Sequence, residues 1–396
     1  MQKLTADYIF PISQPSVKNG IVIVDDNGVI SENVIDPANL DYNISDVKPL
    51  NGFICPGFIN THCHLELSYL KEKIHEHTGI DKFIIELEQQ RKGINEEEKA
   101  QALSDAENEM IENGIVAVGD ICNDNSTFPL KNKGNIYYHS FIETFSSNPE
   151  KADIIFEKAL KLYDEIKNKN NSCSITPHAP YSLSKKLFLK IKTFAEKSGN
   201  ILSIHHQESE EENKFFMSKN GNIKDMLTRF GVTNPDFYNS GLRPLAGIAE
   251  YIPNENNLLL VHNTVTTDND IEFATSYFKN LYWCFCPNAN LYIEQRLPDF
   301  ALFFNNKCKI TIGTDSLASN KILSVLAELK TISASIPFVP LTELLKWATF
   351  NGAEFLKISH KFGSIEKGKS PGILLIENVD VENMKLIKDT EVKAIA

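Results

Sequence analysis

One short segment constrains this chain more than any other: Pro56-Gly57-Phe58-Ile59-Asn60-Thr61-His62-Cys63-His64. Residues i and i+2 of an extended chain point to the same side, so both imidazoles reach one point just beyond a strand end. Imidazole is the commonest metal ligand and suits zinc or iron. The segment predicts a strand that ends in a metal site, provided that the rest of the chain supplies more ligands. Two histidines on a surface loop are the alternative.

Short apolar runs alternate with charged amphipathic segments through most of the chain. We identify eight runs: Gly52–Thr61, Ile115–Cys122, Ile136–Phe145, Ser172–Pro177, Ile201–His205, Leu258–His262, Leu281–Cys286 and Lys309–Thr314. The amphipathic segments include Asp81–Lys92, Glu97–Asn113, Lys151–Lys167, Ser184–Ser198 and Asn222–Phe230. Alternating strands and helices predict a parallel sheet, and eight such units predict a closed (β/α)8 TIM barrel.

Both ends of the chain have β character outside these eight runs. Near the start, Asp25-Asp26-Asn27-Gly28 is a hairpin turn between two apolar runs. Near the end, Ile373–Ile376 and Val392–Ile395 are strand-like. We therefore expect a small β-sandwich built from residues 1–52 and 352–396, beside a barrel of residues 53–351. The long stretch 209–257 is expected to place an additional loop or helix over the mouth of the barrel.

The composition limits the partners. The chain has 396 residues, and its net charge of −12 argues against nucleic acid or an anionic membrane surface as the main partner. Its seven scattered cysteines form no C-x-x-C framework, which predicts reduced thiols and a cytoplasmic protein. The start lacks the features of a signal peptide, and no run of roughly 18 apolar residues predicts a membrane span.

Histidines and carboxylates cluster where the predicted strands end. Five of the eight runs end in such a side chain: His62 and His64, His178, His205-His206 with Glu208, His262, and Asp315. The carboxyl ends of the strands form the active-site face of a parallel barrel. A single histidine at a strand end is commonly structural, but five such ends together predict a functional site.

These residue types fit hydrolysis by a metal-activated water. His62, His64, one histidine of the fifth run and Asp315 make a three-His-one-Asp set that leaves room for a water molecule. A bound metal lowers the pKa of that water toward neutrality. Asp315 can also accept the proton of the attacking water, Glu208 can carry it to a substrate ring nitrogen, and His262 can bind the oxygen of a tetrahedral intermediate. The fourth run ends in His178 where a lysine would allow a carbamate-bridged pair of metals, so we expect one divalent ion, zinc or iron.

The ordered motifs carry a resemblance to a known family. They are PGFINTHCH, TPHAPYS, HHQES, LLVHN, CPNAN and IGTDS, followed by GSIEKGK near the end. The chain resembles the amidohydrolase superfamily in its branch of aromatic deaminases and chlorohydrolases, which includes S-adenosylhomocysteine, methylthioadenosine and aminodeoxyfutalosine deaminases. The resemblance covers nearly the whole chain and implies a barrel with a composite β-sandwich, and a homodimer.

The resemblance also implies individual roles. The family pattern His-x-x-Glu is met by His205 on the metal and Glu208 as proton shuttle, with His206 facing away. His262 polarises the water, and His178 contacts the substrate. The chain departs from the pattern in two places: Ala289 stands where the family has a serine in Cys-Pro-x-Ser-Asn, and Ser370-Pro371-Gly372 replaces Ala-Asp before the closing strand.

Four further residues are candidates for substrate binding. Glu66 follows the metal motif and can read a donor on a base edge, or is an exposed loop carboxylate. Glu143 ends the third run, and Tyr181 can stack on an aromatic ring or form a wall of the core. Arg296, one of four arginines, can hold a substrate carboxylate or serve a structural role.

The residues and the resemblance together predict a metal-dependent hydrolytic deaminase. It would convert an exocyclic amine of a purine nucleoside-like or related heteroaromatic substrate to a carbonyl and release ammonia. The first alternative is a hydrolase of the same superfamily that acts on a cyclic amide, an imine or a C–Cl bond. The second is a non-catalytic barrel that serves as a scaffold.

Overall fold

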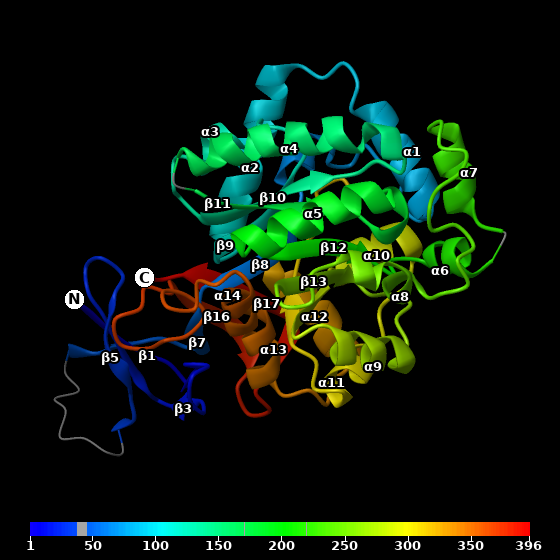
Figure 1. The fold of residues 1–396 in the computed structure, drawn as a ribbon. Helices are drawn as coiled ribbons and strands as arrows, with labels where there is room; N and C mark the ends of the chain where they lie inside the picture. The colour runs from blue at the N-terminus through cyan, green and yellow to red at the C-terminus, as the bar shows by residue number, and fades with distance from the viewer. Residues whose placement is uncertain (38–45, 170, 219) are drawn as a thin grey trace.

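A computed structural model describes residues 1–37, 46–169, 171–218 and 220–396 (Figure 1). Eight strands form two four-stranded sheets, in the orders β11-β10-β9-β8 and β12-β13-β14-β15. All strand pairs within these two sheets are parallel. Their bounds are β8 Phe58–Cys63, β9 Ile115–Cys122, β10 Tyr137–Thr144, β11 Ser172–Pro177, β12 Leu202–His206, β13 Asn257–His262, β14 Asn280–Phe285 and β15 Ile310–Ile312.

The two parallel sheets meet along both outer edges. At one edge, the backbone N–H groups of Thr314 and Asp315 donate to the carbonyl of His62 over 3.0 and 3.1 Å, and a parallel bridge joins Cys63 to Asp315. At the other edge, the N–H of His205 donates to the carbonyl of His178 over 2.9 Å. These hydrogen bonds bring the carboxyl ends of all the edge strands together at one place.

Helices connect and cover the parallel strands. Their bounds are α1 Ile80–Gln90, α2 Glu96–Glu112, α3 Phe128–Lys131, α4 Ala152–Lys167, α5 Lys185–Ser198, α6 Glu210–Met217, α7 Asn222–Arg229, α8 Pro244–Ile248, α9 Asp268–Tyr277, α10 Pro287–Glu294, α11 Phe300–Asn305, α12 Val325–Ser335, α13 Leu341–Ala348 and α14 Phe350–Phe355. α4 contacts β10 and β11, and α5 contacts β11, so these two helices lie side by side over the first sheet (Figure 1). The five helices predicted from amphipathic segments are present within two residues of their expected ends. No helix among the described residues is long and apolar enough to cross a membrane.

The remaining strands lie at one end of the molecule, where both chain termini are found (Figure 1). A five-stranded sheet has the order β17-β16-β7-β2-β3, and a four-stranded sheet has the order β5-β4-β1-β6. The bounds are β1 Gln2–Thr5, β2 Tyr8–Ile9, β3 Val17–Lys18, β4 Ile21–Val24, β5 Ile30–Ile35, β6 Lys48–Pro49, β7 Phe53–Pro56, β16 Ile373–Asp380 and β17 Lys385–Ala394. Side chains of both sheets share one buried apolar cluster, which includes Leu4, Val22, Ile54 and Leu375.

The first apolar run, Gly52–Thr61, is two strands rather than one. β7 pairs with β16 and β2 in the terminal sheet, whereas β8 pairs with β9 in the parallel sheet. The chain changes sheets at Gly57, whose N–H donates to the carbonyls of Pro371 and Gly372. A Cβ at this position would lie 2.6 Å from the carbonyl oxygen of Pro371, so only glycine allows the two segments to pass so closely.

Gly313, directly after β15, should be intolerant of a side chain. A Cβ there would lie 2.8 Å from the Cβ of His62 and 2.8 Å from the sulfur atoms of Cys284 and Cys286. We expect Gly313→Ala to lose about 1–3 kcal/mol of unfolding free energy because of overpacking, measured by denaturant titration. Adding Cys286→Ala removes one of the close contacts. The double variant should therefore lose less unfolding free energy than the losses of the two single variants added together. Wild-type stability of Gly313→Ala would contradict the close packing.

Candidate active site

Four predicted metal-binding side chains converge at the carboxyl ends of β8, β12 and β15. The Oδ1 atom of Asp315 lies 3.6 Å from Nε2 of His62 and 3.5 Å from Nε2 of His64. Nε2 of His64 lies 3.2 Å from Nε2 of His205. One nitrogen of His62 also lies within 4.8 Å of nitrogens of His205 and His262. The structure thus brings together the three histidines and the aspartate.

The donor set fits a divalent cation. His62 is fully buried, and neither of its ring nitrogens has a hydrogen-bond partner among the described residues. Burial lowers the pKa of His64 and His205 well below their ordinary value, so both imidazoles are neutral and offer lone pairs. Buried polar atoms without partners are costly, and a cation between these nitrogens and the carboxylate of Asp315 would satisfy them.

Neighbouring groups fix how the ligands point. Nδ1 of His205 donates to the carbonyl of His178 over 2.9 Å, which leaves Nε2 unprotonated and facing His64. The hydroxyl of Ser319 donates to Oδ2 of Asp315 over 2.5 Å, so Oδ1 is the oxygen turned toward the histidines. Burial opposes ionisation of Asp315, but its interactions with His62, His64 and His262 outweigh burial and hold its pKa well below the usual range.

Unusual backbone conformations surround this cluster. Gln207, His262, Asn263 and Asp315 have φ angles of 44°, 75°, 57° and 57°, in the left-handed region that favours glycine. Such conformations cost of order 1–3 kcal/mol each and are found where the surrounding structure over-determines the position of a side chain. Here they follow strand ends and turn the chain so that His262 and Asp315 face the cluster.

The structure separates the two adjacent histidines of β12. His205 belongs to the cluster, whereas His206 points to the other side of the strand, where its Nδ1 bonds to Oδ1 of Asn263 over 3.0 Å. The ring of His206 packs edge-on against Trp283. This is the arrangement expected from the His-x-x-Glu spacing, because adjacent side chains of a strand face opposite sides. The role of His205 as a ligand remains a prediction.

A cavity of about 420 Å³ opens from the cluster, and Glu208 and His262 line it. Oε1 of Glu208 lies 3.7 Å from Nε2 of His262. Burial raises the pKa of Glu208 well above its ordinary value, so its carboxyl group can hold a proton near neutral pH. Nδ1 of His262 bonds to Oδ1 of Asn290 over 2.8 Å, and Asn290 in turn donates to Thr264. Asn290 was missed as a functional residue, although it lies in the CPNAN motif.

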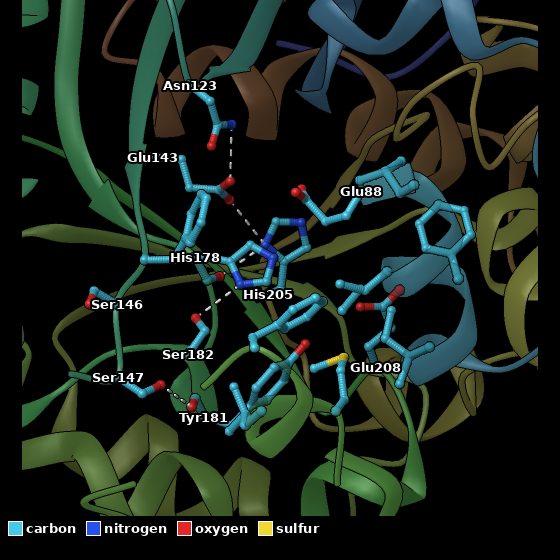
Figure 2. Close-up of a pocket in the computed structure, with 18 of the residues that line it drawn as sticks. Glu88, Asn123, Glu143, Ser146, Ser147, His178, Tyr181, Ser182, His205 and Glu208 are labelled. Atoms are coloured by element: carbon cyan, nitrogen blue, oxygen red, sulfur yellow. Dashed lines mark hydrogen bonds and ion pairs between the residues drawn. The ribbon is translucent and has the colours of Figure 1, made fainter. Parts of the chain in front are cut away.

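Three of the predicted substrate-binding residues line the same cavity (Figure 2). Nδ1 of His178 bonds to the hydroxyl of Ser182 over 3.0 Å, and its ring lies next to that of His205. The amide of Asn123 donates to Oε2 of Glu143 over 3.3 Å, which turns Glu143 toward His205 (Figure 2). Tyr181 is buried and forms part of the cavity wall.

The other two predicted substrate contacts do not line the cavity. Glu66 is buried behind the wall, where it accepts hydrogen bonds from Arg91 and from the N–H of Asn123. The side chain of Arg296 is 53% exposed and pairs with Glu210. α10 ends before Arg296, and the left-handed residue Gln295 (φ 54°) follows the helix. Neither position supports direct contact with a substrate in this cavity.

Arg91 is the arginine that lines the cavity instead. It follows Leu87 by four residues, so it lies on the same face of the helix as the cavity-lining side chains of α1. That periodicity was a signal in the sequence that distinguished Arg91 from the other arginines. Its guanidinium pairs with both Glu66 and Glu88, so its charge is already compensated.

The part of the cavity away from the cluster has apolar walls. α1 contributes Ile80, Phe83, Ile84 and Leu87, and α7 contributes Met226 and Leu227, with Phe230 following it. α7 lies within residues 209–257, where the sequence predicted an additional loop or helix over the mouth of the barrel, and its side chains line this cavity. A flat ring and an apolar substituent would both find complementary surface here.

The family model described as "Amidohydrolase family" matches residues 53–394, so the chain belongs to this family. It is 26% identical over 326 residues to an adenosine deaminase of Helicobacter pylori, covering 81% of this chain and 77% of that protein. It is 25% identical over 380 residues to a 5'-deoxyadenosine deaminase of Methanosphaera stadtmanae, covering 90% and 82%. The fold is similar to that of aminofutalosine deaminase from Helicobacter pylori in complex with methylthio-coformycin, with a TM-score of 0.81, 24% identity, and coverage of 98% and 94%. The family membership confirms the resemblance seen in the sequence.

The paired histidines of β12 provide a matched test of the metal site. We expect His205→Ala to bind metal at least tenfold more weakly, because it removes one of the converging nitrogens. His206→Gln should keep the metal, because His206 lies on the other side of the strand. Metal content after dialysis, measured by elemental analysis, checks both. Equal metal retention by the two variants would contradict the assignment.

Proposed function

We propose that this protein is a metal-dependent hydrolytic deaminase of adenosine-like nucleosides. It replaces the exocyclic amine of a purine-type ring by a carbonyl and releases ammonia. The observation that carries the proposal is the placement of Glu208 and His262 beside a three-histidine, one-aspartate cluster on one cavity. The family membership and the deaminase names of the relatives support the same function.

The ligands in this proposal are His62, His64, His205 and Asp315, which hold one divalent ion. A buried set of three imidazoles and one carboxylate suits zinc, and iron accepts the same donors. When bound, the ion supplies a water molecule that ionises near neutral pH.

The chain's own residues then move protons and orient groups. Nδ1 of His262 is held by Asn290, so Nε2 faces the cavity and orients the attacking water. Asp315 accepts a proton from that water, and Glu208 delivers a proton to the ring nitrogen next to the amine-bearing carbon. The water oxygen bonds to that carbon, and Asp315 passes the proton that it accepted to the amine. The carbon–nitrogen bond then breaks and ammonia leaves, while the remaining hydroxyl proton returns to Glu208 as the carbonyl forms. His178, Glu143 and Tyr181 position the base.

The substrate that fits the cavity best is a nucleoside with an apolar 5' substituent. The polar end of the cavity accommodates the base, and the apolar walls from α1 and α7 then face the substituent. The name 5'-deoxyadenosine deaminase for one relative and the methylthio-coformycin bound to the structural neighbour support a 5' position without a hydroxyl.

The proposal extends to the architecture. The eight parallel strands form one closed barrel, which is supported by the hydrogen bonds from β15 to β8 and from β12 to β11. The terminal sheets form a sandwich of residues 1–52 and 352–396, to which β7 is added, and residues 53–351 otherwise form the barrel. The apolar cluster shared by the two terminal sheets supports this division.

The assembly and location follow from the resemblance and from the thiols. We assign a homodimer, as the family resemblance implies. All seven cysteines are free and six of them are buried, which supports a reducing, cytoplasmic location.

Glu208→Gln should keep its metal and lose about 10²–10⁴-fold in kcat, because general acid–base catalysis contributes that much. Ammonia release from adenosine, 5'-deoxyadenosine and 5'-methylthioadenosine by the metal-loaded protein measures it. Glu210→Gln is the matched control, because Glu210 is an exposed carboxylate two residues away that does not line the cavity. Near wild-type turnover of Glu208→Gln would remove Glu208 from the mechanism. No ammonia from any of these substrates would redirect the assignment to cyclic-amide, imine or C–Cl hydrolysis.

The apolar wall can be tested by competition between substrates. We expect Phe230→Ala to lower kcat/KM for 5'-methylthioadenosine about 10–200-fold more than for adenosine, because a lost apolar contact costs about 1–3 kcal/mol. Phe338→Ala is the control, because Phe338 is an exposed phenylalanine outside the cavity. Parallel losses for both substrates would contradict a 5' substituent against α7.

A further inference from the structure

A second cavity lies at the opposite ends of the strands that form the active site. Its volume is about 400 Å³. Residues 137, 139, 141 and 143 of β10 share one side of the strand, because side chains alternate. Glu143 lines the first cavity, whereas Tyr137 and His139 line the second. On this side of β10, Phe141 lies between Glu143 and His139. Its ring is fully buried and packs against the ring of His139.

The rim of this cavity is positively charged. Lys167, at the end of α4, and Lys357 and Lys361, after α14, line it together with His360. No aspartate or glutamate is among the described residues that line the cavity, and none of these three lysines forms an ion pair with a described carboxylate. In a chain with 52 acidic and 40 basic residues, three lysines without a carboxylate partner around one cavity form a local site of positive potential.

The floor of the cavity is polar and buried. His139 is 8% exposed, and its Nε2 bonds to the hydroxyl of Ser174 on the neighbouring strand over 2.9 Å. Burial first, and then the charges of Lys167, Lys131 and Lys357, lower the pKa of His139 to about 3, so the imidazole is neutral and the field of the lysines reaches the floor. The floor therefore offers hydrogen-bonding groups without negative charge.

An unpartnered amide adds a second, independent sign of a ligand. Asn200 lines the cavity and is 7% exposed, and its side-chain nitrogen has no hydrogen-bond partner among the described residues. A buried donor without a partner costs free energy. The amino-terminal end of a barrel ordinarily serves stability rather than ligand binding. A buried donor without a partner beside a cavity at this end therefore indicates a ligand that can accept a hydrogen bond.

We propose that this cavity binds a phosphate group, carried by a small organic molecule or free in solution. The lysines supply the charge, and the unpartnered amide of Asn200 supplies a donor once its side chain turns toward the bound phosphate. The rings of Tyr137 and Phe362, whose centroids are 6.0 Å apart, line the same cavity and offer surface to an organic part of the ligand. The site is separate from the proposed active site, and the proposal does not depend on the deaminase reaction.

The test is calorimetric titration of the full-length, metal-loaded protein with inorganic phosphate and with phenyl phosphate at physiological salt. We expect saturable binding of one phosphate per chain. The double variant Lys167→Glu/Lys361→Glu should weaken it at least tenfold. Lys161→Glu, on the exposed surface of the same helix α4 and outside the cavity, should leave it within twofold.

The two probes distinguish the sources of the phosphate. Tighter binding of phenyl phosphate identifies an organic phosphate that uses the aromatic rings, and tighter binding of inorganic phosphate identifies the free ion. The site is overturned by absence of saturable binding at concentrations on the order of 10 mM. It is also overturned if the double variant binds as well as the wild type, since binding would then occur elsewhere, including the active-site cavity.

Discussion

The join between β8 and β15 is the interaction on which the rest of the site depends. The carbonyl of His62 accepts hydrogen bonds from the N–H groups of both Thr314 and Asp315. This contact fixes the distance between a histidine near the start of the chain and an aspartate about 250 residues later. Asn60 strengthens it, because its side chain exchanges hydrogen bonds with Thr314. The small residue Gly313 then allows the strand to pass beneath His62 without a clash.

The site is assembled at a cost that the surrounding structure offsets. His64 and His205 are buried and neutral, and His262 and Asp315 have left-handed backbones. A buried ion pair lies beneath it: the carboxylate of Asp120 bonds to Lys131 over 2.6 Å and to the N–H of Leu65 over 2.8 Å. Removing one partner of such a pair leaves an uncompensated buried charge, which is strongly destabilising. Asp120 thereby holds the backbone directly after His62 and His64.

Sequence reasoning succeeded where a side chain's position follows from strand periodicity. His62 and His64 face one side because they are two residues apart, and His205 and His206 face opposite sides because they are adjacent. It was less informative where a position depends on how a loop leaves a helix. Arg296 lies after the end of α10 and reaches the surface, whereas Glu66 is enclosed by Arg91 and Asn123. Asn290 orients His262 from a distant segment of the chain, and Ser319 orients Asp315 across a bent loop. The spacing of residues in the sequence does not reveal contacts of either kind.

The sequence by itself determined the order of strands and helices, the identity of the family and the side chains that gather at the strand ends. These depend on local periodicity and on residue chemistry, which are written along the chain. Only the tertiary structure decided which residues share a cavity, because that depends on how α1, α7 and the strand ends pack together. It alone assigned Gly52–Thr61 to two sheets and brought Lys167, Lys361 and Asn200 around one cavity. Burial and electrostatic potential are properties of the packed chain, so no single segment contains them.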